Sequence, residues 1–438
     1  MVEDAGDEAD ERAGSSDAAD DDRAGDPDVA DDPDAAESVT RVVAKYYLYV
    51  ASRSEGFIYP IVTLFLLHRE LSYAEVGLVN GLFFAGTVAG EIPTGYVADR
   101  LGRRNSLIVS SAAVTGVMLW FTIAETVAEF SLLYVVWGVG VTFRSGAGDA
   151  WLYDTLDERH TTEAYARIKG RASAAFLLTS AVTSLAGGYV YSIDRVAPFY
   201  GAAAVTASGV LILLRFPTTS GGADEERFTA GDAVEIVRTQ FLRPPLRSFI
   251  VVTAVLLAVP ETVDLFVQPI SVDLGVPEAR LGWLYAGFML VSAAATYYTG
   301  ALRDRIGIGG WFAIAPLLVA VPLLATVVAP AAAIPAFFVA RAGKSISYAL
   351  RGQYLNDRLP SLGRATVLST ASLVYGVFIV IGRFVGGALA GALSPTDGLA
   401  VMAAAMPAIV AATYAVENPF SASADGSPDP AVDPAADE

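Results

Sequence analysis

Twelve apolar stretches, each long enough to cross a lipid bilayer as a helix, dominate this amino-acid sequence. A spanning helix needs about 20 largely apolar residues, because the hydrocarbon core is about 30 Å thick and a helix rises about 1.5 Å per residue. By that measure the spans occupy residues 43–67, 74–97, 106–127, 130–153, 172–193, 197–216, 248–270, 279–302, 310–329, 331–355, 365–393 and 397–416. We therefore predict an all-α integral membrane protein with 12 transmembrane helices.

The formal net charge of −18 is concentrated at the two ends of the chain. Residues 1–40 carry 16 acidic side chains against two arginines, and residues 417–438 carry six acidic side chains and no basic one. Both segments are rich in Asp, Ala, Gly, Ser and Pro, a composition that buries too little apolar surface to fold. We predict two disordered acidic tails. Together with the excess of Arg over Lys, they favour a salt-loving microbial source.

The distribution of basic residues in the loops predicts the orientation in the membrane. Arg and Lys in short loops mark the cytoplasmic side. The loops after spans 2, 4, 6, 8 and 10 carry 16 basic residues, whereas the opposite loops carry only Arg69, Arg195 and Arg280. We expect both tails in the cytoplasm, together with the linker 217–247, which separates bundle 41–216 from bundle 248–416. For this linker, a short amphipathic helix and a flexible segment are equally open.

One loop motif occurs twice. The stretch Gly95-Tyr-Val-Ala-Asp-Arg-Leu-Gly-Arg-Arg104 follows span 2, and a fainter copy, Gly300-Ala-Leu-Arg-Asp-Arg-Ile-Gly307, follows span 8. Three pairs of residues share the same separation of 205 positions, namely Asp99 and Asp304, Arg100 and Arg305, and Gly102 and Gly307. This offset predicts duplication of a six-span unit, and therefore two six-helix bundles related by a pseudo-two-fold axis. Such duplication is typical of secondary transporters.

Ionisable side chains within the spans mark the candidate site. A charge at the bilayer centre costs about 2.5–3.5 kcal/mol, so it normally faces protein or a water-filled cavity. Most of these side chains fall in spans 1, 4, 7 and 10, the first helix of each three-helix unit. The set comprises Arg53, Glu55, Arg144, Asp149, Glu261, Asp264, Arg341 and Lys344, with Arg383 in span 11 and Glu91 in span 2.

Helical spacing orders part of this set. Glu261 and Asp264 share one helix face, and Arg341, Lys344, Tyr348 and Arg351 form one basic stripe. One interpretation is that the charged residues bind a polar solute and a coupling ion, H⁺ or Na⁺, with Glu55 and Glu261 as the proton carriers. The alternative is that they form buried ion pairs that hold the bundle together. Glu91, which leads directly into the first loop motif, is interpreted as structural.

The Gly95–Arg104 stretch resembles the loop signature of the major facilitator superfamily, G-x-x-x-D-R-x-G-R-R/K. The resemblance covers residues 41–416 and implies two bundles around a cavity, lined by spans 1, 4, 7 and 10, that opens alternately to each side. Ser145–Asp154 and Arg364–Ser369 resemble the drug-efflux-like branch of prokaryotic members, here a haloarchaeal one. However, span 5 lacks the Gly-Pro pair typical of proton antiporters, and Trp137 lies near the usual arginine of span 4.

The same resemblance implies that the loop motif is a gate. Gly95 and Gly102 would permit close helix approach and a tight turn. Asp99 would accept hydrogen bonds from helix N-termini, and Arg103 would pair with Asp154 at the inner end of span 4. Arg100 belongs to the same motif, and Asp304 and Arg305 would form its reduced counterpart. A topological anchor of arginines at the membrane surface is a compatible alternative.

The expected function is therefore ion-coupled transport of a small organic solute, with efflux favoured. The alternatives are uptake of a sugar or organic anion, or a membrane sensor without turnover. The chain has no cysteine, its two histidines, His68 and His160, fall in predicted loops, and it has no phosphate-binding G-x-x-x-x-G-K motif. We expect no enzymatic activity, cofactor, metal or nucleic-acid partner, and a monomer in the plasma membrane.

Overall fold

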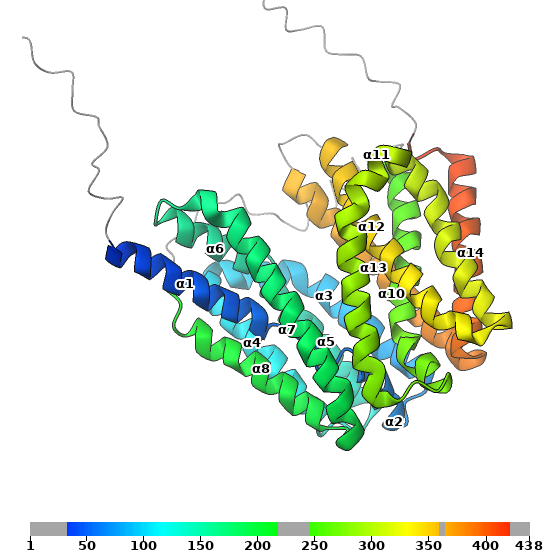
Figure 1. Ribbon diagram of the computed structural model, residues 1–438, viewed down its shortest axis with the longest axis horizontal. Coiled ribbons are helices and arrows are strands. Elements are labelled where there is room, and N and C mark those ends of the chain that lie inside the picture. The colour runs from blue at the N-terminus through cyan, green and yellow to red at the C-terminus, as the bar shows by residue number, and fades with distance from the viewer. Residues whose placement is uncertain (1–32, 218–245, 359–363, 421–438) are drawn as a thin grey trace, which may run out of the picture.

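The structure is a computed structural model that describes residues 33–217, 246–358 and 364–420. Within these ranges the chain is helical and contains no β-strand (Figure 1). Most of the predicted tails 1–40 and 417–438, and nearly all of the linker 217–247, lie outside the described residues. By length and composition, seven of the described helical segments are able to cross a membrane. The number of twelve spans therefore stays a prediction.

The first half of the chain forms the helices α1 to α8. Their bounds are α1 Pro33–Ser52, α2 Val62–His68, α3 Tyr73–Leu101, α4 Arg103–Phe121, α5 Val127–Thr142, α6 Ala147–Asp157, α7 Tyr165–Ile193 and α8 Ala197–Leu213. Two starts are fixed by capping boxes, in which a hydroxyl and a glutamate satisfy each other's backbone N–H groups. Ser72 and Glu75 form this cap at α3, and Thr126 and Glu129 form it at α5.

The second half forms α10 to α14, which are α10 Leu246–Asp273, α11 Leu281–Val328, α12 Ala333–Arg358, α13 Arg364–Ala392 and α14 Pro395–Val416. Helix α11 contains both spans predicted at 279–302 and 310–329, which meet at a kink where Gly307 has a φ of 71°. Gly102, between α3 and α4, has a φ of 80°. No neighbouring atom would lie within 4 Å of a Cβ at either position, so the left-handed backbone, rather than lack of space, requires glycine there.

Two predicted spans are interrupted in the middle. Span 43–67 is divided into α1 and α2 by residues 53–61, and span 130–153 is divided into α5 and α6 by residues 143–146. Pro60 lies in the first interruption, and Gly146, with a φ of 71°, ends the second. A Cβ on Gly56 would lie 2.5 Å from the carbonyl oxygen of Ser180, so the first interruption packs closely against α7. Arg53 and Arg144 therefore lie on non-helical backbone, where the sequence predicted continuous helices.

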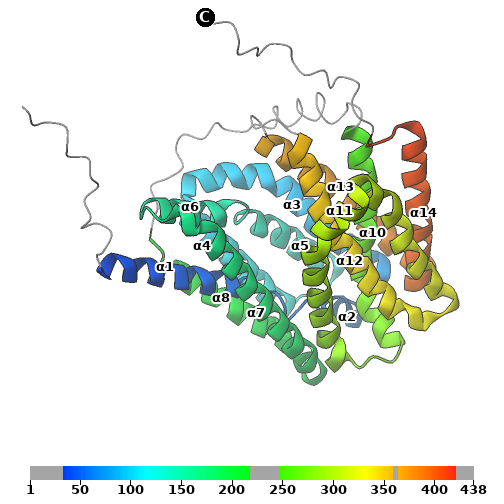
Figure 2. The same cartoon turned by 45° about the horizontal axis from the view of Figure 1, so that its top comes forward.

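The two halves form two groups of helices that are in contact along only part of their length (Figures 1 and 2). In the first group α1 packs on α7 and α8, and α3 packs on α5. In the second group α10 packs on α12, α13 and α14. Helix α3 also contacts α13, and α7 contacts α11, which joins the groups. The groups diverge toward the side that carries α6, here termed the open face, and meet near α2, here termed the closed face.

Backbone-to-backbone contacts join the halves at the closed face. A Cβ on Gly77 of α3 would lie 2.6 Å from the Cα of Gly387 in α13. A Cβ on Gly282 of α11 would overlap the backbone of Ser184 in α7. Gly77 and Gly282 are 205 residues apart, which is the offset of the duplicated loop motif. The two halves therefore contribute equivalent glycines to two equivalent contacts.

Candidate functional site

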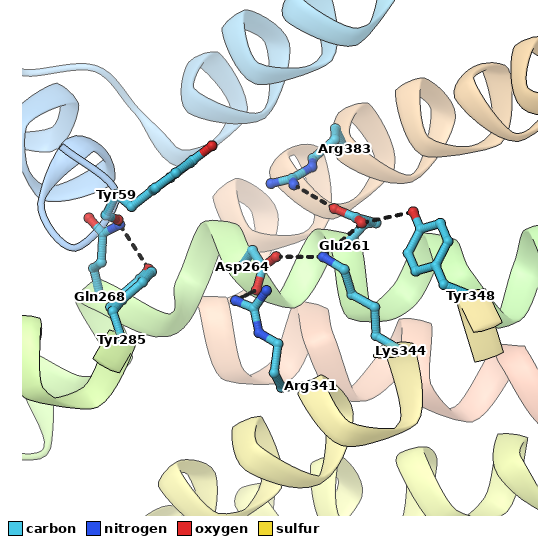
Figure 3. Close-up of polar contacts among 9 residues, drawn as sticks. All are labelled: Tyr59, Glu261, Asp264, Gln268, Tyr285, Arg341, Lys344, Tyr348 and Arg383. Atoms are coloured by element: carbon cyan, nitrogen blue, oxygen red, sulfur yellow. Dashed lines mark hydrogen bonds and ion pairs between the residues drawn. The ribbon is translucent and has the colours of Figure 1, made fainter. Parts of the chain in front are cut away.

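Five charged side chains of the second half form one network (Figure 3). Glu261 and Asp264 lie on α10, Arg341 and Lys344 on α12, and Arg383 on α13. Lys344 Nζ lies 2.7 Å from Glu261 Oε1 and 3.0 Å from Asp264 Oδ2. Arg341 Nη2 lies 2.7 Å from Asp264 Oδ1, and Arg383 Nη2 lies 3.4 Å from Glu261 Oε2. Three cations thus share two carboxylates, which leaves one positive charge in excess.

Aromatic side chains extend this network. The Tyr348 hydroxyl donates a hydrogen bond of 3.1 Å to Glu261 Oε1 (Figure 3). The guanidinium carbon of Arg383 lies 5.3 Å from the ring centroid of Phe84 in α3, a cation–π contact that crosses between the halves. The second-half network is therefore in contact with the first half through Arg383.

Among the candidate residues of the first half, Glu55 and Asp149 each have one basic partner and Arg53 has no acidic partner among the described residues. Glu55, only 4% exposed, lies 3.4 Å from Arg144 Nη2. Asp149 lies 2.7 Å from Lys169 Nζ, and both side chains are about half exposed. Arg53 forms no ion pair with any described residue, and its buried Nε has no hydrogen-bond partner. The structure thus brings together the second-half candidates and separates those of the first half.

Two cavities lie between the halves, and a third, lined by described residues of the first half alone, shares part of its wall with one of them. The cavity lined by both halves near the network has a volume of about 670 Å³, which is within the usual range for small-molecule sites. The two others measure about 570 Å³ and 460 Å³. All nine residues proposed for solute or ion binding line the first or the last of these, namely Glu55, Glu261, Asp264, Arg341, Lys344 and Arg383 in the first, and Arg53, Arg144 and Asp149 in the last.

Gln268 of α10 makes the most complete polar contact between the halves. Its Oε1 accepts hydrogen bonds from the backbone N–H groups of Thr63, at 2.8 Å, and Leu64, at 3.1 Å. Its Nε2 donates to the carbonyl of Tyr59, at 2.8 Å, and to the hydroxyl of Tyr285, at 3.0 Å (Figure 3). The N–H groups at the start of α2 have no partner within their own helix, so Gln268 supplies it.

Sequence reasoning did not identify Gln268, because it considered charged side chains and tyrosines but no amides. The available signal was an amide within an apolar span, since a buried amide needs hydrogen-bond partners. His68, which the sequence placed in a loop, is instead the last residue of α2. Its Nδ1 lies 2.7 Å from the Tyr191 hydroxyl and its Nε2 lies 3.8 Å from Glu278 Oε1. No group of described residues is arranged to hold a metal ion.

The first loop motif makes one of its two expected contacts. Arg103 forms an ion pair with Asp154 of α6 and donates a 2.7 Å hydrogen bond to the carbonyl of Ala150. Asp99 is exposed and makes no ion pair with a described residue, and a Cβ on Gly95 would meet no atom within 4 Å. The expected bonds to Asp99 and the close approach at Gly95 are therefore not formed in this state.

The remaining motif residues make only local contacts. Arg100 lies over the ring of Tyr96, one turn before it on α3, at 4.1 Å from the centroid. In the second copy, Asp304 pairs with the adjacent Arg303 at 2.7 Å, and Arg305 is exposed. Within the part of the chain that the structure describes, Asp304 and Arg305 thus form no ion pair with another helix, unlike Arg103 in the first copy.

Comparison with known proteins agrees with this architecture. Residues 50–270, about half of the chain, match the family model of the Major Facilitator Superfamily. The chain therefore belongs to the major facilitator superfamily, which confirms the resemblance seen in the loop motif. It is a multi-pass transporter of the cell membrane and not an enzyme.

The relatives named in these comparisons are distant. The uncharacterized MFS-type transporter YxaM of Bacillus subtilis (strain 168) is 22% identical over 374 residues, which cover 82% of this chain and 90% of that protein. The uncharacterized MFS-type transporter YcaD of Shigella flexneri serotype 5b (strain 8401) is 24% identical over 253 residues, which cover 56% of this chain and 62% of that protein.

Two solved structures show the same fold. A mutant of the nucleoside transporter NupG matches with a TM-score of 0.72 at 12% identity, covering 87% of this chain and 100% of that chain. A bacterial homolog of the human lysosomal transporter Spinster, inward-facing and unoccupied, matches with a TM-score of 0.67 at 16% identity, covering 88% and 96%. At such low identity these structures establish the fold alone.

Proposed function

We propose that this protein is a secondary active transporter that moves a small organic solute by alternating access. The observation that supports this most directly is the cavity of about 670 Å³ between two helix groups that are joined on one side of it only. The contacts on that side include the close glycine approaches and the hydrogen bonds of Gln268, which would have to separate for the other side to open. A solute bound between the halves would then be exposed to the other side.

The orientation of this state follows from the basic loops. The duplicated loops at Gly102 and Gly307 carry arginines, which favours the cytoplasm for the face on which they lie. We infer that the open face is cytoplasmic and that the structure is inward-facing, with twelve spans and both acidic tails in the cytoplasm. In this proposal the pair of Arg103 and Asp154 belongs to the cytoplasmic gate.

Coupling to a proton is proposed for Glu261. Its carboxylate is buried, lies in the cavity wall and accepts from Lys344, Arg383 and Tyr348. Protonation of Glu261 would weaken its attraction to both cations and loosen α12 and α13 from α10. The likeness of Ser145–Asp154 to drug-efflux-like members supports efflux. The positive excess of the five-residue network supports an organic anion as the solute, whichever the direction.

A flux assay in proteoliposomes tests this proposal. A panel of labelled sugars, nucleosides, organic cations and organic anions is offered with and without a proton or sodium gradient. Gradient-driven accumulation of at least one solute is expected. Glu261→Gln should retain exchange but lose accumulation, whereas Glu125→Gln, at an exposed carboxylate near the closed face, should behave as the wild type. Ligand-induced thermal stabilisation without any flux would favour a sensor and contradict the proposal.

A further inference from the structure

The side chains that line the three cavities carry more positive than negative charge. Among the described residues, seven cations line them, namely Arg53, Arg144, Lys169, Arg341, Lys344, Arg351 and Arg383. Five carboxylates do so, namely Glu55, Glu91, Asp149, Glu261 and Asp264. The formal excess is two positive charges. Within a membrane such an excess is unfavourable unless a bound anion balances it.

Two of the seven cations have no carboxylate partner among the described residues. Arg144, Lys169, Arg341, Lys344 and Arg383 all lie within 4 Å of a carboxylate oxygen. Arg53 and Arg351 do not, and the Nε atom of each is buried without a hydrogen-bond partner. An arginine is charged at any accessible pH, so both carry unbalanced charge.

Arg351 is held in place by aromatic rings. Its guanidinium carbon lies 4.2 Å from the ring centroid of Tyr375 and 4.8 Å from that of Tyr348. The Tyr375 hydroxyl is 2.8 Å from Thr253 Oγ1, and the Tyr348 hydroxyl is bonded to Glu261, so both rings are themselves fixed. Ring contact leaves the N–H edges of a guanidinium free, and those edges match the oxygen pair of a carboxylate.

Arg53 approaches the same region from the first half. It lines the 460 Å³ cavity, and Arg351 lines the 570 Å³ cavity. These two cavities share Thr87, Glu91 and Ser145 in their walls. Phe84 lines both the 570 Å³ cavity and the large one, where many aromatic side chains lie. A solute whose polar group lies between the two arginines could therefore extend its apolar part into the large cavity with the aromatic side chains.

We propose that the solute is an amphipathic organic anion whose carboxylate binds between Arg53 and Arg351 and whose apolar body occupies the 670 Å³ cavity. This inference rests on the transport function proposed above and names its substrate class. Closing the open face would bring the two arginines, one from each half, closer together in a medium of low dielectric constant. Their repulsion opposes closure of the empty protein, and a bound carboxylate removes that opposition.

Glu91 places a negative charge beside the proposed anion site. It lies in the wall shared by the two cavities and accepts a 2.8 Å hydrogen bond from Ser145, but it has no basic partner among the described residues. The charged groups around it are Arg53, Arg144, Asp149 and Lys169 in one cavity and Arg351 in the other. Its negative charge repels an incoming carboxylate, so its removal should tighten anion binding.

Binding to the full-length protein in lipid nanodiscs tests the inference. The probes are benzoate, phenylbutyrate and decanoate, each compared with its uncharged amide by calorimetry and by flux in proteoliposomes. At least one acid should bind and be transported while its amide is not. Arg53→Gln and Arg351→Gln should each weaken the acid at least tenfold, equivalent to about 1.4 kcal/mol. Glu91→Gln should strengthen binding of the acid. Arg280→Gln, at an exposed arginine near the closed face, should leave that binding unchanged.

The outcomes separate the substrate class from the transport function. Binding of none of the three acids, equal binding of an acid and its amide, or wild-type affinity in both glutamine variants would overturn the anion site. Arginine-dependent binding without flux would instead contradict transport and leave the site intact. Arg53→Lys and Arg351→Lys keep the charge and should retain measurable binding. If they bind no better than the glutamine variants while remaining folded by circular dichroism, charge is not what holds the solute.

Discussion

The contact made by Gln268 predicts which conformation the protein prefers. Three of its four hydrogen bonds connect α10 to the first half, through Thr63, Leu64 and Tyr59. Replacing Gln268 with leucine keeps a similar volume and removes all three. When the closed face opens, water satisfies the freed backbone groups, so the substitution disfavours only the state in which this face is closed.

The size of the effect follows from the number of bonds. Each intramolecular hydrogen bond contributes about 0.5–1.5 kcal/mol net, so three bonds contribute about 1.5–4.5 kcal/mol. Because about 1.4 kcal/mol corresponds to a factor of ten, Gln268→Leu should shift the conformational equilibrium by roughly ten- to a thousand-fold. The open face would then close in a large fraction of molecules.

Spin-label distances measure this shift directly. The chain contains no cysteine, so Asp157→Cys on α6 and Asp357→Cys on α12, both exposed, provide a unique label pair across the open face. Pulsed electron paramagnetic resonance should show a new, shorter distance in Gln268→Leu and not in the matched control Gln353→Leu. A folded Gln268→Leu protein with the wild-type distance distribution would refute the reasoning.

Two further predictions concern the closed face and the end of the last helix. Gly77→Ala places a Cβ against the Gly387 backbone at a cost of about 1–3 kcal/mol to the closed state of this face, so the distance between the same two labels should become shorter. Gly116→Ala, where the added Cβ meets no atom within 4 Å, should leave that distance unchanged. Hydrogen bonds from Ser248 and Arg247 hold the pKa of Glu417 below its usual 4.5. The bonds to Glu417 stabilise the fold above that pH and lose effect as the pH falls through the lowered pKa. Glu417→Gln should therefore lower the melting temperature at pH 6, and a deficit that is equally large under acidic conditions would contradict this.

The sequence predicted those parts of the fold that depend on span length and on local backbone chemistry. Run lengths of apolar residues are set by bilayer thickness, so the predicted ranges lie within a few residues of α3, α10, α12 and α14. The shared offset of Gly102 and Gly307 identified two positions that both have positive φ. Interrupted helices escaped prediction, because an apolar stretch broken near Pro60 or Gly146 has the same composition as a continuous one.

Pairings between distant residues were harder to foresee. Helical spacing grouped Glu261 with Asp264 and aligned Arg341 with Lys344, and these residues do meet in one network. No spacing rule connects Asp149 with Lys169, or Gln268 with the N-terminus of α2, because such contacts depend on how separate helices dock. Contacts between the halves depend in addition on which conformation the transporter has adopted.

The glycine contacts at the closed face have a consequence for how this protein cycles. Two backbone segments that meet with no side chain between them can separate and meet again without any change of side-chain rotamer. At Gly77 and Gly282, where an added Cβ would overlap the opposite backbone, the halves could therefore separate without rearranging side chains. Substitutions at these few positions would change the rate at which the halves separate without altering the residues that line the 670 Å³ cavity.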